Sequence, residues 1–191
     1  MHETIQELLA DLGIQPEYTN ATLQNLGNAD SKYLRDLKLN VKAVLTSEHL
    51  SAKETHLLAL AVTTNNNIEI LSNAFATKAK ENGATDAEIA DAQACASLLS
   101  ANNVFYRFRH FIEKEAYNNA PARLRMNIMM NPVLGKEFFE LVSLAVSAVN
   151  GCEMCVKSHE QSVLHAGSTE LRIWDAIRIA SIITSLGKIV Y

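Results

Sequence analysis

Proline and glycine are scarce in this chain of 191 residues, with 3 and 7 residues respectively. Because both residue types interrupt helices and shape tight turns, their scarcity argues against a fold of short strands and turns. No uninterrupted apolar run approaches the roughly 20 residues that a membrane-spanning helix needs. The amino-terminal segment has no basic stretch leading into an apolar run, so we expect no signal peptide and predict a cytoplasmic protein.

Basic residues are not in excess either. The net charge is −4, the isoelectric point is near 5.9, and no block of Lys and Arg stands out. A nucleic-acid partner needs a basic face, so we expect none. The chain has only 3 cysteines, two of them in a C-x-x-C. That spacing indicates redox or metal chemistry rather than the disulfide framework of a secreted protein.

Helical periodicity is what the chain has in abundance. Apolar residues recur at three- and four-residue spacing, and strand-like alternation is nearly absent. Ser51 with Glu54, and Thr85 with Glu88, fit the capping box that satisfies free N–H groups at a helix start. We therefore predict an all-α fold. The segments predicted to be helical on this basis are residues 53–63, 86–102, 136–149 and 169–186.

An internal repeat appears when the chain is shifted against itself by 84 residues. The shift pairs residues 57–62 with 141–146 without a gap, and it also pairs the Gly83-x-Thr85 and Gly167-x-Thr169 turns. We predict one all-helical domain, residues 1–191, built from a duplicated helical-hairpin unit. Its parts are a helical extension at 1–50, a degenerate repeat at about 51–117, a connector at 118–132 and a second repeat at about 133–191.

The second repeat carries the C-x-x-C. Asn150 is a plausible N-cap and Gly151 a natural break, which places Cys152 in the first turn of a helix and Cys155 one turn later. The positive end of the helix dipole favours a thiolate there. At this spacing the two thiols can also close into a disulfide.

His159 and Glu140 complete the group of candidate residues. His159 lies one turn beyond Cys155 on the same face, where it can exchange a proton with the thiol. If the two helices form an antiparallel hairpin, Glu140 faces the middle of the returning helix, about where His159 falls, and can orient and charge it.

The first repeat lacks these reactive groups. At the 84-residue shift the positions of Cys152, Cys155, His159 and Glu140 are occupied by Ile68, Leu71, Phe75 and His56. The scaffold is therefore repeated without them, which indicates that they are not needed for folding.

The same residues have alternative interpretations. Zinc sites also use C-x-x-C, so a helical interaction module with zinc on Cys152, Cys155 and His159 is the non-enzymatic alternative. Glu140 could be a solvated surface carboxylate, and we expect Cys95 to be an inert core thiol. The histidines expected to serve in packing or at the surface, rather than as ligands, are His56, His110 and His165. The other residues expected in the core are Phe138, Phe139 and Trp174. Met129 and Met130 could form a contact surface, but packing is the default expectation for them.

Three stretches carry a resemblance to a known family. They are Arg125-Met-Asn-Ile, Asn131-Pro132, and residues 139–160 with the pattern Glu-x11-Cys-x2-Cys-x3-His. The chain resembles the alkyl hydroperoxidase D family of the carboxymuconolactone decarboxylase-like superfamily, over most of its length. The resemblance implies an all-helical subunit with a duplicated unit, commonly a homotrimer, in an antioxidant role.

The resemblance also implies how electrons move and which residues act. No metal or organic cofactor is expected. A dihydrolipoyl group (dihydrolipoamide) on an acyltransferase-type protein would supply electrons, and the dithiol would pass them to a peroxiredoxin and, more weakly, to alkyl hydroperoxides. Carried over, Cys155 becomes a sulfenic acid, and Glu140 and His159 form the proton relay that activates it. Cys152 donates a proton, resolves the sulfenic acid as the Cys152–Cys155 disulfide, and forms the mixed disulfide with the peroxiredoxin.

One position departs from the family. Some members carry a histidine between the two cysteines, where this chain has Met154. If that histidine assists proton transfer in those members, this chain has only His159 and Glu140 for the task. We then expect direct peroxide turnover to be lower, with disulfide exchange less affected. A decarboxylase-like enzyme acting on a lactone is the alternative within the superfamily, and it would not need the C-x-x-C.

Overall fold

The computed structural model describes residues 2–191, and its regular structure is helical, with no strand in this part of the chain. The prediction of an all-α fold is confirmed. The helices are α1 (Glu3–Asp11), α2 (Ala21–Asn28), α3 (Lys32–Leu45), α4 (Ala52–Asn65), α5 (Glu69–Glu81), α6 (Asp86–Ile112), α7 (Glu115–Asn119), the short 3-10 helix η1 (Asn127–Met129), α8 (Lys136–Val149), α9 (Glu153–His165) and α10 (Glu170–Leu186).

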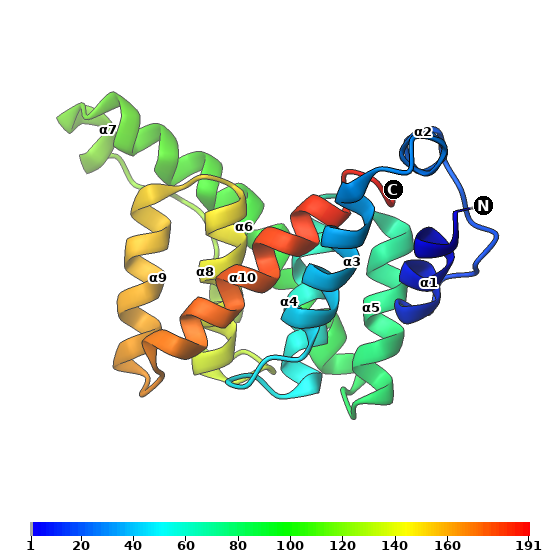
Figure 1. Cartoon of the computed structure of the whole chain (residues 1–191). Helices are drawn as coiled ribbons and strands as arrows, with labels where there is room; N and C mark the ends of the chain where they lie inside the picture. Colours follow the sequence, from blue (N-terminus) through cyan, green and yellow to red (C-terminus); the bar gives the residue numbers. More distant parts are fainter. Residues whose placement is uncertain (1) are drawn as a thin grey trace.

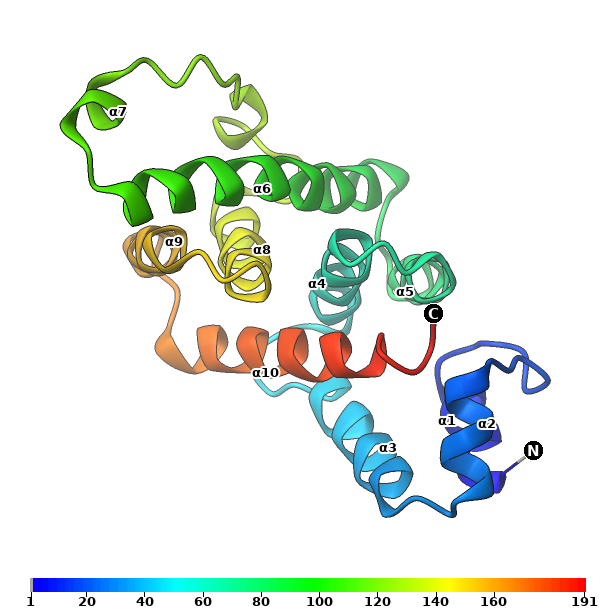
Figure 2. The ribbon, with the colours of Figure 1, turned by 90° about the horizontal axis from the view of Figure 1, so that it is seen from above.

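Two helical hairpins form the body of the molecule. Figure 2 shows α4 and α5 beside α8 and α9, all viewed nearly end-on, with α6 along one side and α10 along the other. The amino-terminal helices α1 to α3 lie on the far side of α10 from the two hairpins, and α3 packs against α10 (Figure 2). Helices α6 and α10 thus join the two hairpins into one core.

The helix starts follow the capping signals in the sequence. Both predicted capping boxes are present, with Ser51 and Glu54 at the start of α4, and Thr85 and Glu88 at the start of α6. The prediction for α8 matches its bounds, whereas α6 continues ten residues beyond the predicted end at 102. The extra length carries α6 past the body, and it projects together with α7 and the connector (Figure 1).

The helices of the two hairpins correspond in position along the chain. α4 and α8, and likewise α5 and α9, start and end 84 residues apart. Lys53 Nζ lies 2.7 Å from Glu88 Oε1, and Glu137 Oε1 lies 3.0 Å from Arg172 Nε. These two ion pairs occupy the same pair of shifted positions with their charges exchanged. The division into repeats at about 51–117 and 133–191 stays a prediction.

Helices α4 and α8 are the most deeply buried. Every residue from 138 to 147 in α8 is buried, as expected for a helix that is apolar on nearly all sides. The predicted burial of Phe138 and Phe139 is confirmed, and Met129 packs on the core. The predictions for Trp174 and Met130 are wrong, because they are 65% and 83% exposed.

The exposure of Trp174 follows from how α10 is turned. This helix buries the face that carries Ala176, Ile179 and Ile183, and that face excludes Trp174. Across residues 2–191, no helix combines the length and the apolar character that crossing a membrane requires.

Candidate redox site

The turn between α8 and α9 sets the position of the first cysteine. Asn150 is the C-cap of α8, and Gly151 follows with a φ of 67°. The N–H of Gly151 donates to the carbonyl of Ala148 and that of Cys152 to the carbonyl of Ser147, which together form a Schellman motif. Cys152 is the N-cap of α9. The prediction of Asn150 as the N-cap is therefore wrong, because the Schellman motif uses it to end α8.

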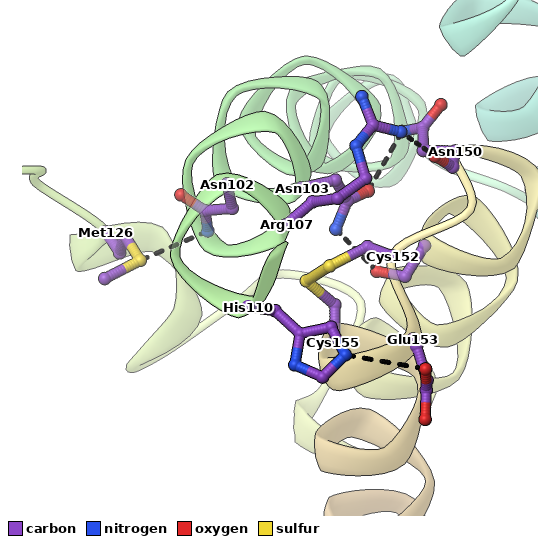
Figure 3. Close-up of a disulfide and its surroundings, with 10 residues drawn as sticks. Asn102, Asn103, Arg107, His110, Met126, Asn150, Cys152, Glu153 and Cys155 are labelled. Atoms are coloured by element: carbon purple, nitrogen blue, oxygen red, sulfur yellow. Dashed lines mark hydrogen bonds and ion pairs between the residues drawn. A yellow bond between two sulfur atoms is a disulfide. The ribbon is translucent and has the colours of Figure 1, made fainter. Parts of the chain in front are cut away.

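Side chains from α6 brace this turn. Asn103 donates to Ser147 Oγ at 2.9 Å and accepts from Asn150 Nδ2 at 2.9 Å, and Arg107 donates to the Asn150 carbonyl oxygen at 2.5 Å. Figure 3 shows Asn103, Arg107 and Asn150 above the disulfide in this view. Neither Asn103 nor Arg107 was among the residues predicted for the site. The available signal was a polar pair, Asn102 and Asn103, inside an otherwise apolar helical stretch.

The two cysteines form a disulfide with a Cα–Cα distance of 5.3 Å. Cys152 has no exposed surface, whereas Cys155 is 7% exposed. Both lie at the amino-terminal end of α9, where the helix dipole favours a negative charge such as a thiolate. Of the two sulfur-bearing residues, Cys155 is thus the one that solvent or a small molecule reaches.

Glu140 and His159 meet across the α8–α9 hairpin. His159 Nδ1 lies 2.6 Å from Glu140 Oε2, and the two residues are only 9% and 3% exposed. This contact agrees with the antiparallel hairpin argument, and the burial of Glu140 excludes a solvated surface carboxylate. Lys136 Nζ lies 2.8 Å from the other oxygen, Glu140 Oε1. Burial alone would raise the pKa of Glu140, but hydrogen bonds from His159 and Lys136 outweigh it and lower the pKa below its ordinary value.

A cavity of about 400 Å³ adjoins Cys155 and His159. Its lining is mostly apolar and comes from α6, α9 and the connector that contains η1. The sequence analysis did not identify it, because its walls are distant in the chain. The lining residues are Leu99, Asn102, Asn103, Tyr106, Met126, Met129, Met154, Cys155, Ser158 and His159.

The remaining candidate residues lie outside this cavity. Cys95 is fully buried with its Sγ 3.4 Å from Ser143 Oγ, and burial raises the pKa of its thiol to about 12. The predicted core position of Cys95 is confirmed, and its lack of reactivity stays a prediction. His110 is directed from α6 toward the first turn of α9, where its Nε2 lies 3.5 Å from Glu153 Oε2 (Figure 3). In the described part of the chain, no three His, Cys, Asp or Glu residues are grouped so that they could hold a metal ion.

Comparison with known proteins agrees with this arrangement. The model of the carboxymuconolactone decarboxylase family matches residues 32–113 and again 115–190. The chain belongs to this family. It is 42% identical over 163 residues to the alkyl hydroperoxide reductase AhpD of Anaeromyxobacter dehalogenans (strain 2CP-C), which covers 85% of this chain and 87% of that protein.

Two further relatives carry the same name. The alkyl hydroperoxide reductase AhpD of Rhodopseudomonas palustris (strain BisA53) is 38% identical, over 86% of this chain and 91% of that protein. That of Coxiella burnetii (strain Dugway 5J108-111) is 37% identical, over 82% of this chain and 90% of that protein. The resemblance deduced from the sequence motifs is thereby confirmed.

Proposed function

We propose that this member of the carboxymuconolactone decarboxylase family is a thiol-dependent alkyl hydroperoxide reductase that uses Cys152 and Cys155 as its redox pair. One observation carries the proposal: Cys155 opens onto an apolar cavity that it shares with His159, and the Nδ1 atom of His159 contacts the buried Glu140. The relatives named above, about 40% identical, add support because each is named for this activity.

The chemistry balances with two thiols and one hydroperoxide. The Cys155 thiolate attacks the terminal oxygen of ROOH, the O–O bond breaks, and the alkoxide takes a proton to leave as ROH. Cys155 is then a sulfenic acid, Cys–SOH. Attack by the Cys152 thiolate on that sulfur forms the disulfide, and the departing hydroxide takes a proton to become water.

The relay is the pair Glu140 and His159. We assign to His159 the proton exchange with Cys155, and to Glu140 the orientation of the imidazole ring through Nδ1. Cys152 gives up its own proton before it resolves the sulfenic acid. No bound metal or organic cofactor takes part in these steps.

The dithiol must be reduced again after each turnover. We propose that a dihydrolipoyl group on an acyltransferase-type protein reduces the disulfide and is itself oxidised to the cyclic lipoyl disulfide. The reduced pair would also pass electrons to a peroxiredoxin through a mixed disulfide at Cys152. Because Cys152 is fully buried in the disulfide form, that exchange requires the first turn of α9 to open.

We also propose that the chain assembles as a homotrimer. Support comes from the projecting end of α6, α7 and the connector, which carry large apolar side chains that the single chain leaves exposed. These are Val104, Phe108, Phe111, Ile112, Tyr117 and Leu124. Sedimentation equilibrium of the purified protein tests this, and a monomer at micromolar concentration would refute it.

The first experiment measures turnover of cumene hydroperoxide with dihydrolipoamide for wild type, Cys152→Ser and Cys155→Ser, with Cys95→Ala as the matched control. We expect both site variants to lose turnover, Cys152→Ser to accumulate a sulfenic acid on Cys155 that dimedone traps, and Cys95→Ala to remain active. Peroxide consumption that survives in both site variants would refute the proposal.

Two alternatives would then come forward. Stoichiometric zinc in the purified protein would favour an interaction module with a metal on Cys152, Cys155 and His159. Conversion of a lactone by the cysteine variants would favour a decarboxylase-like enzyme, an activity for which the family is named.

A further inference from the structure

Lys136 occupies a position in the site that the roles assigned so far do not explain. It is the first residue of α8, one turn before Glu140, and its Nζ lies 2.8 Å from Glu140 Oε1. The opposite oxygen, Oε2, is the one that contacts His159. The carboxylate therefore has one permanent cation on one oxygen and a titratable ring on the other.

A second contact keeps Lys136 in place. Its Nζ also donates to the carbonyl oxygen of Met129 at 2.9 Å, and Met129 is part of the cavity wall. The lysine side chain is 55% exposed, so it reaches inward from solvent between the wall and the carboxylate. Two acceptors fix an ammonium group that a single exposed partner would hold weakly.

Burial makes this pair different from the other lysine pair at the same spacing. Lys157 and Glu153 on α9 are also four residues apart, but both side chains are largely exposed, so water screens their attraction. The Glu140 side chain is only 4% exposed. Removal of the lysine would leave a buried carboxylate with His159 as its remaining hydrogen-bond partner, and a buried charge that loses a partner takes up a proton more readily.

We propose that Lys136 is a positioning residue of this site: its ammonium group holds Glu140 as a carboxylate directed at His159, and the Met129 carbonyl fixes that ammonium group. The proposal rests on the proposed function, since the relay matters only if the dithiol reacts. Other ionisable groups near the relay are Cys95 of α6, a buried thiol on which the charge of Glu140 acts, Tyr106 of α6, which lines the same cavity, and Cys155 of α9. In the disulfide form Cys155 does not titrate.

The test is a titration of Glu140 in the oxidised, full-length protein. The protein is labelled with 13C at the glutamate carboxyl carbons, and Glu140→Gln identifies the resonance. We expect Lys136→Met to raise the pKa of Glu140 by about one pH unit and Lys136→Arg to leave that pKa nearly unchanged. Lys80→Met is the matched control, because it removes the same charge from an exposed pair with Asp86 on the other hairpin.

Peroxide turnover supplies the second measurement. In Lys136→Met the acid limb of the pH–rate profile should shift to higher pH, by as much as the titration of the Glu140 carboxyl group does. In Lys136→Arg the acid limb should lie at the pH of the parent protein. An unchanged Glu140 titration in Lys136→Met overturns the proposal, and so does a shifted titration with an unshifted acid limb. If the parent protein turns over no hydroperoxide, the proposed function fails, while the Glu140 titration still decides whether Lys136 holds the carboxylate.

Discussion

Glu140 Oε2 lies 2.6 Å from His159 Nδ1, and the two positions 84 residues earlier hold His56 and Phe75, whose ring centroids are 6.3 Å apart. The same place between two paired helices is thus a buried hydrogen bond between a carboxylate and an imidazole in one hairpin and a contact between two rings in the other. The surrounding helices start and end at corresponding residues in both. The same helical hairpin therefore forms with either pair of residues. The Glu140–His159 contact is not required for the fold, so it is available for a role in the reaction.

Replacing Glu140 by Gln tests that contact. The amide keeps the size of the side chain but cannot bear the charge that complements His159. We expect hydroperoxide turnover to fall about 100-fold or more, with little loss of helical content by circular dichroism. Glu137→Gln is the control, because Glu137 lies on the same helix but pairs with Arg172. Equal losses in both variants would assign the effect to structure rather than to the relay.

The backbone conformation of the turn before Cys152 predicts which substitutions Gly151 tolerates. Gly151 has a φ of 67°, and the residue at the shifted position, Asn67, has a φ of 56° in the same Schellman motif. Asn adopts this left-handed backbone more readily than other residues with a side chain, and β-branched residues adopt it least. We expect Gly151→Val to lower the free energy of unfolding by about 1–2 kcal/mol more than Gly151→Asn does. Urea unfolding measures both, and equal values would contradict the argument.

The methionines of the cavity predict substrate selectivity. Met126 and Met129 line the cavity beside Cys155, whereas Met130 is 83% exposed. Truncation to Ala removes apolar contact with the organic part of a hydroperoxide. For cumene hydroperoxide we expect kcat/KM to fall about tenfold in Met126→Ala or Met129→Ala. Hydrogen peroxide has no organic part, so kcat/KM for hydrogen peroxide should not change in these variants. Met130→Ala is the control and should change kcat/KM for neither substrate. An equal loss of kcat/KM for both substrates would show that the methionines do not determine substrate selectivity.

The salt bridges of Arg172 predict a pH-dependent contribution to stability. Arg172 contacts both Glu54 and Glu137, and its side chain is only 18% exposed. Burial alone would raise the pKa of Glu54, but hydrogen bonds from Arg172 and Ser51 lower it overall. A carboxyl group whose pKa is lowered in the folded state stabilises above its unfolded pKa, and this stabilisation is lost as pH falls through the folded value.

Arg172→Met should therefore unfold at lower urea than the parent at pH 7, and the difference should shrink below about pH 4. Arg178→Met is the control, because Arg178 is 49% exposed and pairs with Asp175 alone. A difference between parent and Arg172→Met that stays constant from pH 7 to pH 3 would contradict the explanation.

The sequence by itself determined the local structure. Three local patterns can be recognised from the sequence without knowledge of the fold: the capping boxes, the helical periodicity and the spacing of the cysteines. Each depends only on residues within one or two helical turns of each other. They predicted Ser51 as the N-cap of α4, the bounds of α8 and the proximity of Cys152 to Cys155. The contact of Glu140 with His159 could also be predicted, because two helices joined by a short turn pack against each other as an antiparallel hairpin.

Only the tertiary structure decided which distant segments complete the site. Asn103 and Arg107 come from α6, more than 40 residues before the turn that they brace. The cavity adds the connector around Met129. Packing between separate helices depends on how each is rotated about its axis, and an Ala- and Leu-rich helix does not encode that rotation clearly in one sequence. The rotation of α10 about its axis likewise turned Trp174 to solvent.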